Sequence, residues 1–220
     1  MKKITTIMIG VALMVNLNLN AQCVQKGSVL VDAYYGFPNL FESILKTDAN
    51  NIQNSTSGTS ASTAIGSLSI YGIGPMGAKA EYLLTDKFGM GIDFNYSNVG
   101  IKFSNATVDQ NGNAVTYNYN LSSPAIRAML GFNFHFVRTD KLDVYWAVKA
   151  GYYNRSFGMV TNDPNYRLNL SLGDPLAFRI EIGMRYFFTE NIGLNVNLGF
   201  PGGPLIAAGV SFKFGGGGSK

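Results

Sequence analysis

Hydrophobic and polar residues alternate with a period of two along much of the chain. From Phe178 to Phe188 the even positions are large and apolar, whereas the odd positions include Arg179, Glu181 and Arg185. Successive side chains of a β-strand point to opposite faces of a sheet, so this period predicts strands with one apolar and one polar face. The segments with this pattern are residues 28–36, 77–84, 88–96, 115–136, 142–157, 178–188, 192–200 and 205–214.

Two architectures are compatible with such strands. In a soluble sandwich the apolar faces form the core, whereas in a membrane barrel they face lipid and the polar faces line the interior. The polar faces here are rich in Gly and Asn, as at Gly89, Gly91 and Asn95, which are poor strand formers on a solvent face but fit a crowded lumen. The composition, 46% hydrophobic and 14% charged, favours the second reading. We therefore expect an all-β, eight-stranded, antiparallel up-and-down transmembrane β-barrel.

Short and long connections between the strands set the expected orientation. Thr85-Asp86-Lys87, Thr139-Asp140-Lys141 and Thr189-Glu190-Asn191 are short turns, whereas residues 39–76, 105–114 and 159–175 form long segments. In outer-membrane barrels the short turns lie in the periplasm and the long loops at the cell surface. Both chain ends should then lie in the periplasm. A parity change near Ser122-Ser123-Pro124 predicts a β-bulge.

The N-terminal residues are typical of a secretory signal peptide. Lys2 and Lys3 precede an apolar stretch, and Leu19-Asn20-Ala21 is a suitable cleavage site, so we expect a signal peptide at 1–21, a barrel domain at 22–214 and a flexible Gly-rich tail at 215–220. Without Lys2 and Lys3, 15 Lys and Arg face 13 Asp and Glu, a net charge of +2. That charge is too small to favour nucleic-acid binding.

Aromatic residues are expected to form belts at the two membrane interfaces. The turn side of the barrel would carry Tyr82, Phe88, Phe134, Phe136, Tyr186, Phe188 and Phe214. The loop side would carry Tyr35, Tyr96, Tyr152, Phe178 and Phe200.

The chain resembles the small outer-membrane barrels of the OmpA, OmpX and OmpW type (the porin family), in a style common among Bacteroidota. The resemblance is carried by Gly77-Ala78-Lys79-Ala80-Glu81-Tyr82, by Thr85-Asp86-Lys87-Phe88-Gly89-Met90-Gly91 and by the final Gly209-Val210-Ser211-Phe212-Lys213-Phe214. It departs from that class in the Gly-rich residues after Phe214, since members usually end in the aromatic residue.

This resemblance implies a non-enzymatic protein of the bacterial outer membrane with a structural or surface-interaction role, for example as an accessory subunit of an envelope complex. The alternative is a narrow channel for small or hydrophobic solutes, as in OmpW-like porins. The implied partners are outer-membrane lipid and lipopolysaccharide, the barrel-assembly machinery and an envelope protein, and no nucleic acid.

Charged residues gather on the predicted inward faces. The set comprises Lys79, Glu81, Asp93, Arg127, Lys149, Arg155, Arg179, Glu181 and Arg185, together with His135. A symmetric hairpin around Asp86 places Lys79 opposite Asp93, and buried charges are costly unless they are paired. The set is therefore interpreted as an ion-pair network that fills a narrow lumen, with a conducting or gated pore as the alternative.

Catalytic chemistry is not expected. A Ser/His/acid hydrolase needs a histidine beside its nucleophile, and the chain has one histidine, His135, close to the turn at Thr139. Its single cysteine, Cys23, lies outside the strands and cannot form an intrachain disulfide. We expect no catalytic residues, no cofactor and no metal site.

Two long connections have patterns of their own. Around Pro38 the chain has apolar residues at helical spacing, which predicts a short amphipathic helix in the first surface loop; they are Phe37, Leu40, Phe41, Ile44 and Leu45. This helix either packs on the barrel rim or contacts lipid, a solute or a partner protein. In the third loop, alternation from Tyr166 to Leu172 could extend a sheet above the membrane with residues 115–121. An exposed strand edge can recruit a partner.

Overall fold

The computed structural model describes residues 22–37, 68–108, 112–164, 169–172 and 176–216. All of its regular secondary structure in these ranges is β-strand. The strands are β1 (Val29–Phe37), β2 (Ser69–Leu83), β3 (Phe88–Val108), β4 (Ala114–Arg138), β5 (Leu142–Thr161), β6 (Asn169–Leu172), β7 (Ala177–Phe187), β8 (Ile192–Phe200) and β9 (Ile206–Phe214). No helix among the described residues has the length and hydropathy of a membrane span.

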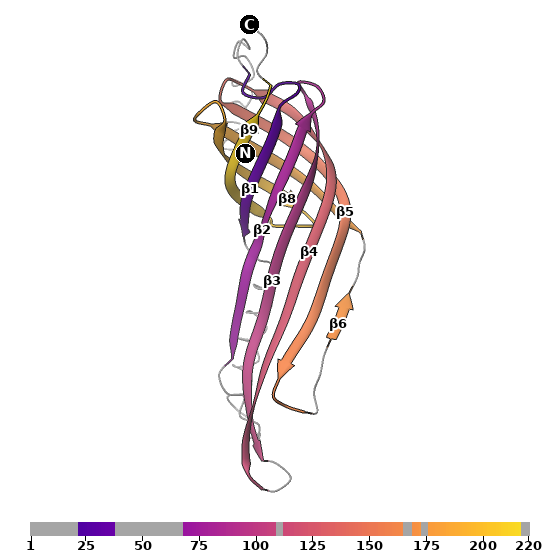
Figure 1. The fold of residues 1–220 in the computed structure, drawn as a ribbon, viewed down its shortest axis with the longest axis vertical. Helices are drawn as coiled ribbons and strands as arrows, with labels where there is room; N and C mark the ends of the chain where they lie inside the picture. Colours follow the sequence, from indigo (N-terminus) through magenta and orange to yellow (C-terminus); the bar gives the residue numbers. More distant parts are fainter. Residues whose placement is uncertain (1–21, 38–67, 109–111, 165–168, 173–175, 217–220) are drawn as a thin grey trace, which may run out of the picture.

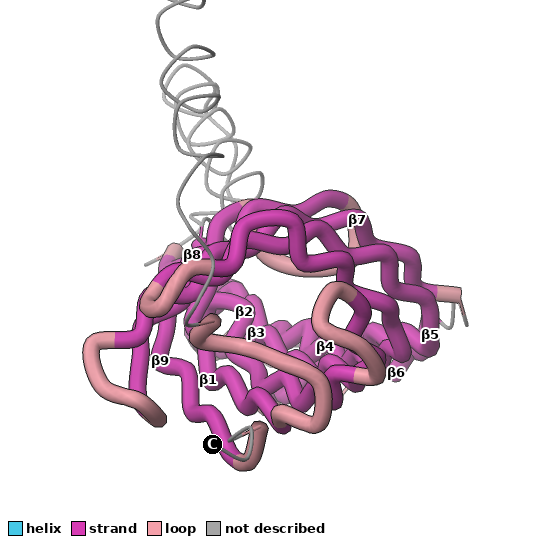
Figure 2. The backbone as a smooth tube through the Cα atoms, turned by 90° about the horizontal axis from the view of Figure 1, so that it is seen from above, coloured by secondary structure: helices cyan, strands magenta, loops and turns pink. Residues whose placement is uncertain are grey.

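The strands close into a barrel. Each barrel strand pairs antiparallel with its neighbours in the order β1, β2, β3, β4, β5, β7, β8, β9, and β9 pairs with β1 to complete the ring seen end-on in Figure 2. The short strand β6 pairs with β5 beyond the last residue that β5 shares with β7, so it lies outside the ring. The predicted eight-stranded antiparallel barrel is confirmed.

The three short turns are built alike. In each turn the threonine Oγ1 accepts hydrogen bonds from the backbone N–H groups two and three residues later, which closes the chain tightly. Thr85 accepts from Phe88 at 3.0 Å, Thr139 from Leu142 at 2.9 Å and Thr189 from Ile192 at 2.9 Å. We call this end of the barrel the turn end, and the opposite one the loop end.

Strands β2 to β5 continue far beyond the loop end of the barrel, whereas β1, β7, β8 and β9 stop at it (Figure 1). We call the projecting part of β2 to β5 the extension. Sequence reasoning underestimated it, because residues 69–76 and 105–108 were expected in loops and belong to β2 and β3. The expected sheet beyond the barrel is present, and β6 is the later part of the run in the third loop.

The predicted bulge at Ser122-Ser123-Pro124 is wrong. Strands β3 and β4 pair without a register shift from Phe88 and Phe134 to Val108 and Ala114. The register shifts instead between Ile73 and Met76 in β2 and between His135 and Val137 in β4. The parity change in β4 therefore reflects a change of surroundings along a regular strand, not an inserted residue.

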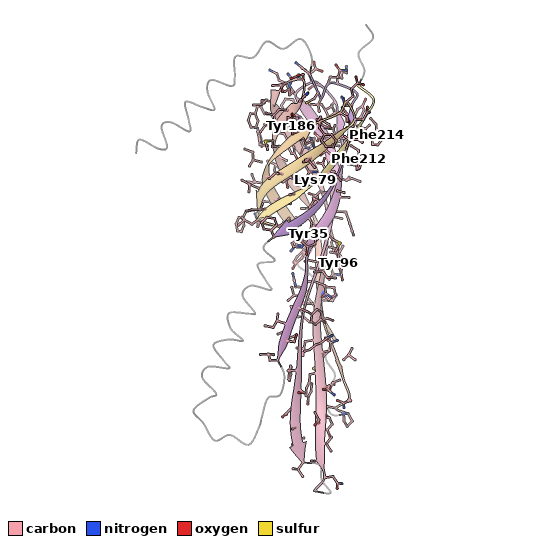
Figure 3. The ribbon with its side chains drawn as sticks, turned by 90° about the vertical axis from the view of Figure 1, so that its left-hand side faces the viewer. Tyr35, Lys79, Tyr96, Tyr186, Phe212 and Phe214 are labelled. Carbon is pink, nitrogen blue, oxygen red and sulfur yellow. The ribbon has the colours of Figure 1, made fainter. Side chains whose placement is uncertain are left out.

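The outside of the barrel is apolar. Ile92 and Phe94 of β3, Leu130 of β4 and Ile180 of β7 are each more than 50% exposed, whereas the inward residues between them are buried. Tyr186 and Phe214 lie toward one end of the barrel, and Tyr35 and Tyr96 toward the other (Figure 3). An apolar band between aromatic belts is the exterior of a transmembrane barrel.

Two sequence predictions lie outside the described residues. They are the helix that includes Leu40, Phe41, Ile44 and Leu45, and the beginning of the third-loop run at Tyr166 and Leu168. The signal peptide at 1–21 lies outside them as well. Phe37, which the sequence assigns to the predicted helix, is instead the last residue of β1, because it pairs with Ile206 of β9.

Candidate functional site in the barrel lumen

The lumen is filled by charged side chains that contact one another. They arrive there because every second residue of a strand points inward, and the inward row of every barrel strand includes at least one buried polar or charged residue. The interacting set consists of Asp32, Lys79, Glu81, Asp93, His135, Asp143, Lys149, Arg179, Glu181 and Arg185, and we call it the lumen network.

Arg185 of β7 is the centre of the half of the network nearer the turn end. Its guanidinium contacts three carboxylates: Asp32 at 2.9 Å, Glu81 at 2.9 Å and Asp143 at 3.1 Å. It also stacks on the ring of Tyr145, with 4.3 Å between the guanidinium carbon and the ring centroid. A planar guanidinium with five N–H donors suits this role, because a lysine ammonium could not reach three carboxylates in one plane.

His135 joins the same half through both ring nitrogens. Nδ1 lies 2.6 Å from Asp143 Oδ1, and Nε2 lies 2.8 Å from Glu81 Oε1. A neutral imidazole has one N–H donor, whereas an imidazolium has two, so hydrogen bonds to two carboxylate acceptors require the protonated ring. The side chain is fully buried, which leaves neither nitrogen open to a substrate.

Glu181 is the centre of the other half. It contacts Lys79, Lys149 at 3.1 Å and Arg179 at 2.8 Å. Lys149 also lies 2.7 Å from Asp93, whose second oxygen accepts a hydrogen bond of 2.7 Å from the hydroxyl of Tyr34. The members of the two halves come from six different strands, β1 to β5 and β7, so the network ties the barrel walls to one another.

The network is balanced in charge. Its positive members are Lys79, Lys149, Arg179, Arg185 and the imidazolium of His135, and its negative members are Asp32, Glu81, Asp93, Asp143 and Glu181. Burial of an ion is costly unless opposite charges and hydrogen bonds compensate it. Each buried charge here has at least one opposite partner, so the arrangement is that of a packed core.

The structure brings most of the sequence-predicted charges together, with different partners from those expected. Lys79 is paired in register with Asp93, as the hairpin geometry predicts. The ammonium of Lys79 nevertheless contacts Glu181, and Asp93 is held by Lys149. Pairing across the lumen takes precedence over pairing along the wall, because a lysine side chain is long enough to reach the centre of the lumen.

Asp32 and Asp143 are members that sequence reasoning missed. Both lie on inward rows: Asp32 between Leu30 and Tyr34, and Asp143 two residues before Tyr145. Strict application of the period-two rule to these segments would have found them, since each is an isolated acid whose neighbours on either side face outward.

Arg127 and Arg155 lie at the loop end, apart from the lumen network. Arg127 donates to the Asn95 side-chain oxygen at 3.2 Å, and its guanidinium carbon is 4.3 Å from the centroid of the Tyr153 ring. Arg155 donates to the Tyr153 hydroxyl at 2.7 Å and to Ser123 Oγ at 2.9 Å. These two predicted members therefore have mainly neutral neighbours.

The turn end is sealed by the start of the described chain. Cys23 and Val24 form an apolar cluster with Leu30, Leu83 and Phe187, all at most 4% exposed. The Cys23 N–H donates to Thr139 O at 2.7 Å, and the Lys213 ammonium donates to Cys23 O at 2.9 Å. Burial, with the Asp143 carboxylate nearby, raises the pKa of the Cys23 thiol to about 12, so the thiol is inert at neutral pH.

Metal binding is not supported in the part of the chain that the structure describes. No group of three or more His, Cys, Asp or Glu side chains there could hold a metal ion. The acidic groups of the lumen are each occupied by arginine, lysine or the imidazolium.

Similarity to known proteins is found among solved structures. No protein-family model and no curated protein matches the chain. Among solved structures, it is similar to the N-terminal β-barrel domain of Pseudomonas aeruginosa OprF, with a TM-score of 0.44 and 15% identity over 87% of this chain and 100% of that one. It is also similar to Ail, the attachment invasion locus protein of Yersinia pestis, in complex with the heparin analogue sucrose octasulfate, with a TM-score of 0.41 and 10% identity over 86% and 99%. At such low scores the architecture rests on this chain's own strand pairing.

Proposed function

We propose that the protein is a non-enzymatic, non-conducting barrel of the bacterial outer membrane that presents the extension at the cell surface as an interaction surface. The observation that carries this proposal is the reversal of side-chain polarity along single strands. On β3 the outward residues are Ile92 and Phe94 in the barrel and Lys102 in the extension. Apolar outward residues suit lipid and polar ones suit water.

The closed lumen supports the non-conducting part of the proposal. The lumen network, with its centres at Glu181 and Arg185, fills the lumen, and the cluster of Cys23 and Phe187 lies on its turn-end side. A steady channel for solutes would need a continuous path of water through both layers. Purified full-length protein in planar bilayers should therefore show no steady open channels, and stable conductance steps would contradict this and favour the alternative, a narrow channel for small or hydrophobic solutes.

The proposed orientation places the extension outside the cell and both chain termini in the periplasm. Cysteine substitution of Asn118 in the extension and of Asp140 in a short turn gives a matched pair, because both side chains are exposed. A membrane-impermeant maleimide added to intact cells should label N118C and not D140C. The inert thiol of Cys23 keeps the background low. Labelling of D140C alone would show that the barrel has the opposite orientation.

The edge of the extension is the proposed contact for an extended segment of an envelope protein. Residues 69–73 of β2 pair with β3 on one side, and no described strand pairs with them on the other. Such an edge offers backbone N–H and C=O groups to an added strand. An accessory role in an envelope complex follows from this contact.

Cross-linking tests the edge directly. Ser69→Cys lies on the edge, and Ile92→Cys, a matched exposed position, lies on the lipid-facing side of the barrel. After mild-detergent purification from native membranes, a short thiol-to-amine cross-linker should join one and the same envelope protein to S69C and not to I92C. Equal products at both positions, or none at S69C, would contradict the proposal.

A further inference from the structure

Arg127 is a cation whose charge the described part of the chain does not balance. The lumen network is neutral within itself, so it has no surplus carboxylate for Arg127. Arg127 has no carboxylate within ion-pair distance among the described residues, and its contacts are the Asn95 oxygen and the Tyr153 ring. We propose that the loop end of the lumen binds a small oxyanion, a carboxylate or a phosphate, beside Arg127 and Asn95.

Asn95 provides the second, independent observation. Its side chain is 1% exposed, and its Nδ2 group has no hydrogen-bond acceptor. Its oxygen already accepts from Arg127, so the amide cannot be turned around without placing two donors together. A buried donor without an acceptor is unfavourable, and nearly all buried polar groups in folded proteins find a partner. An anion oxygen would supply the missing acceptor.

The surroundings of Arg127 favour an anion further. The titratable groups that act on it are the phenols of Tyr153 and Tyr34, which are neutral at neutral pH, and the guanidinium groups of Arg155 and Arg179, which are positive. Asp93, which precedes Asn95 by two residues in the inward row of β3, is occupied by Lys149 and Tyr34. An anion beside Arg127 would therefore offset the repulsion that these two guanidinium groups exert on it.

The shape of the site limits the size of the ligand. The Tyr153 ring covers one face of the Arg127 guanidinium, so a ligand must approach the N–H edge. The fork of N–H donors along that edge matches the oxygens of a carboxylate or phosphate. Arg127 is half-buried and its neighbour Asn95 is buried, and both lie toward the loop end of the barrel, so the anion would enter from the loop end. The site goes beyond the proposed surface role, because it lies inside the barrel wall and not on the extension.

Anion titration of the full-length protein in neutral detergent tests the site. With ionic strength held constant by sodium chloride, inorganic phosphate or acetate should raise the Tm saturably and give measurable heat of binding. Arg127→Gln should weaken the binding at least tenfold. Lys102→Gln, which removes an exposed cation of the extension from the outward face of β3, is the matched control and should bind as the wild type does.

Asn95→Asp sharpens the test, and it also serves if Arg127→Gln does not fold. It places a carboxylate beside Arg127, which would neutralise the guanidinium, and it removes the amide donor proposed for the anion, so N95D should no longer respond to phosphate or acetate. Undiminished binding in N95D or R127Q, or no saturable binding in the wild type, would overturn the proposal. A response that appears only in vesicles of anionic lipid, and not in neutral detergent, would assign the anion to the membrane and overturn it as well.

Discussion

The barrel and the extension share strands β2 to β5 and place opposite kinds of residue on the same faces. In the barrel the outward face of β3 carries Ile92 and Phe94 and its inward face carries Asp93. In the extension the outward face carries Lys102, whereas the inward face carries Ile101 and Phe103. Because the β3–β4 register is unbroken, each face of the strand keeps its direction from the barrel into the extension. The change in residue type therefore reflects a change in the surroundings of the strand.

This difference shows where the membrane ends. On β3 the outward residues are apolar as far as Tyr96, and the inward residues are apolar from Val99 to Phe103. Across the neighbouring strands, Ile70, Ile101, Leu121 and Met159 form one inward row. In lipid the apolar side must face out, whereas in water it must face in. The reversal near Ser97 therefore marks the boundary between lipid and water.

The largest expected effect comes from the lumen network. Arg185→Leu leaves Asp32, Glu81 and Asp143 without their shared cation, and loss of one partner of a buried ion pair costs about 3–5 kcal/mol. We expect most of the variant protein to remain unfolded after refolding into detergent, as measured by the heat-dependent shift of the folded band on gels. Lys102→Leu removes a cation from the extension and should refold as the wild type does. Equal yields of the two variants would show that the network is not essential to folding.

The next effect compares the two outward faces. Ile92→Arg places a charge toward lipid near the middle of the barrel segment of β3, where it should cost about 2–4 kcal/mol. Ser104→Arg places the same charge on the outward face of the extension and should change the free energy of unfolding by less than about 0.5 kcal/mol. Urea unfolding in lipid vesicles measures both. A similar cost at the two positions would contradict the proposed boundary.

Much of the barrel could be predicted from alternation alone, because each strand must satisfy two environments along its whole length. The parity of Phe178 to Phe188, for example, defines both faces of β7. The length of the extension could not be predicted from alternation in the same way. Beyond the membrane both faces tolerate mixed residues, as in residues 69–76, where Gly74 and Pro75 interrupt the pattern and pairing with β3 decides the outcome.

The candidate site shows the same limit. Which residues point inward follows from period two, but which charges meet across the lumen depends on the stagger of strands far apart in the sequence. Arg185 and Asp32 are separated by 153 residues and meet within 3.1 Å. The β2–β3 register makes Lys79 and Asp93 neighbours. In the closed barrel Lys79 instead pairs with Glu181, and Asp93 pairs with Lys149.

A smaller effect distinguishes the two faces within the extension. Ile101→Ser removes apolar contacts from the half-buried inward row and should cost about 1 kcal/mol, since it takes away part of a partly buried aliphatic side chain. Lys102→Ser, its neighbour on the exposed face, should cost almost nothing. Hydrogen exchange of the β3 and β4 amides in the extension reports the difference. Faster exchange in K102S than in I101S would mean that the inward row does not stabilise the sheet.

The smallest expected effect lies in the repeated turns. Thr85→Ala removes the acceptor of the N–H groups of Lys87 and Phe88, and a hydrogen bond of this kind contributes about 0.5–1.5 kcal/mol. The lower end of that range applies here, because the turn is exposed and water replaces the lost acceptor. Thr85→Ser keeps the hydroxyl and is the matched control, so it should unfold in urea at a higher midpoint than T85A. If the two variants unfold together, the hydroxyl does not hold the turn, and the recurrence of threonine at positions 85, 139 and 189 has another cause.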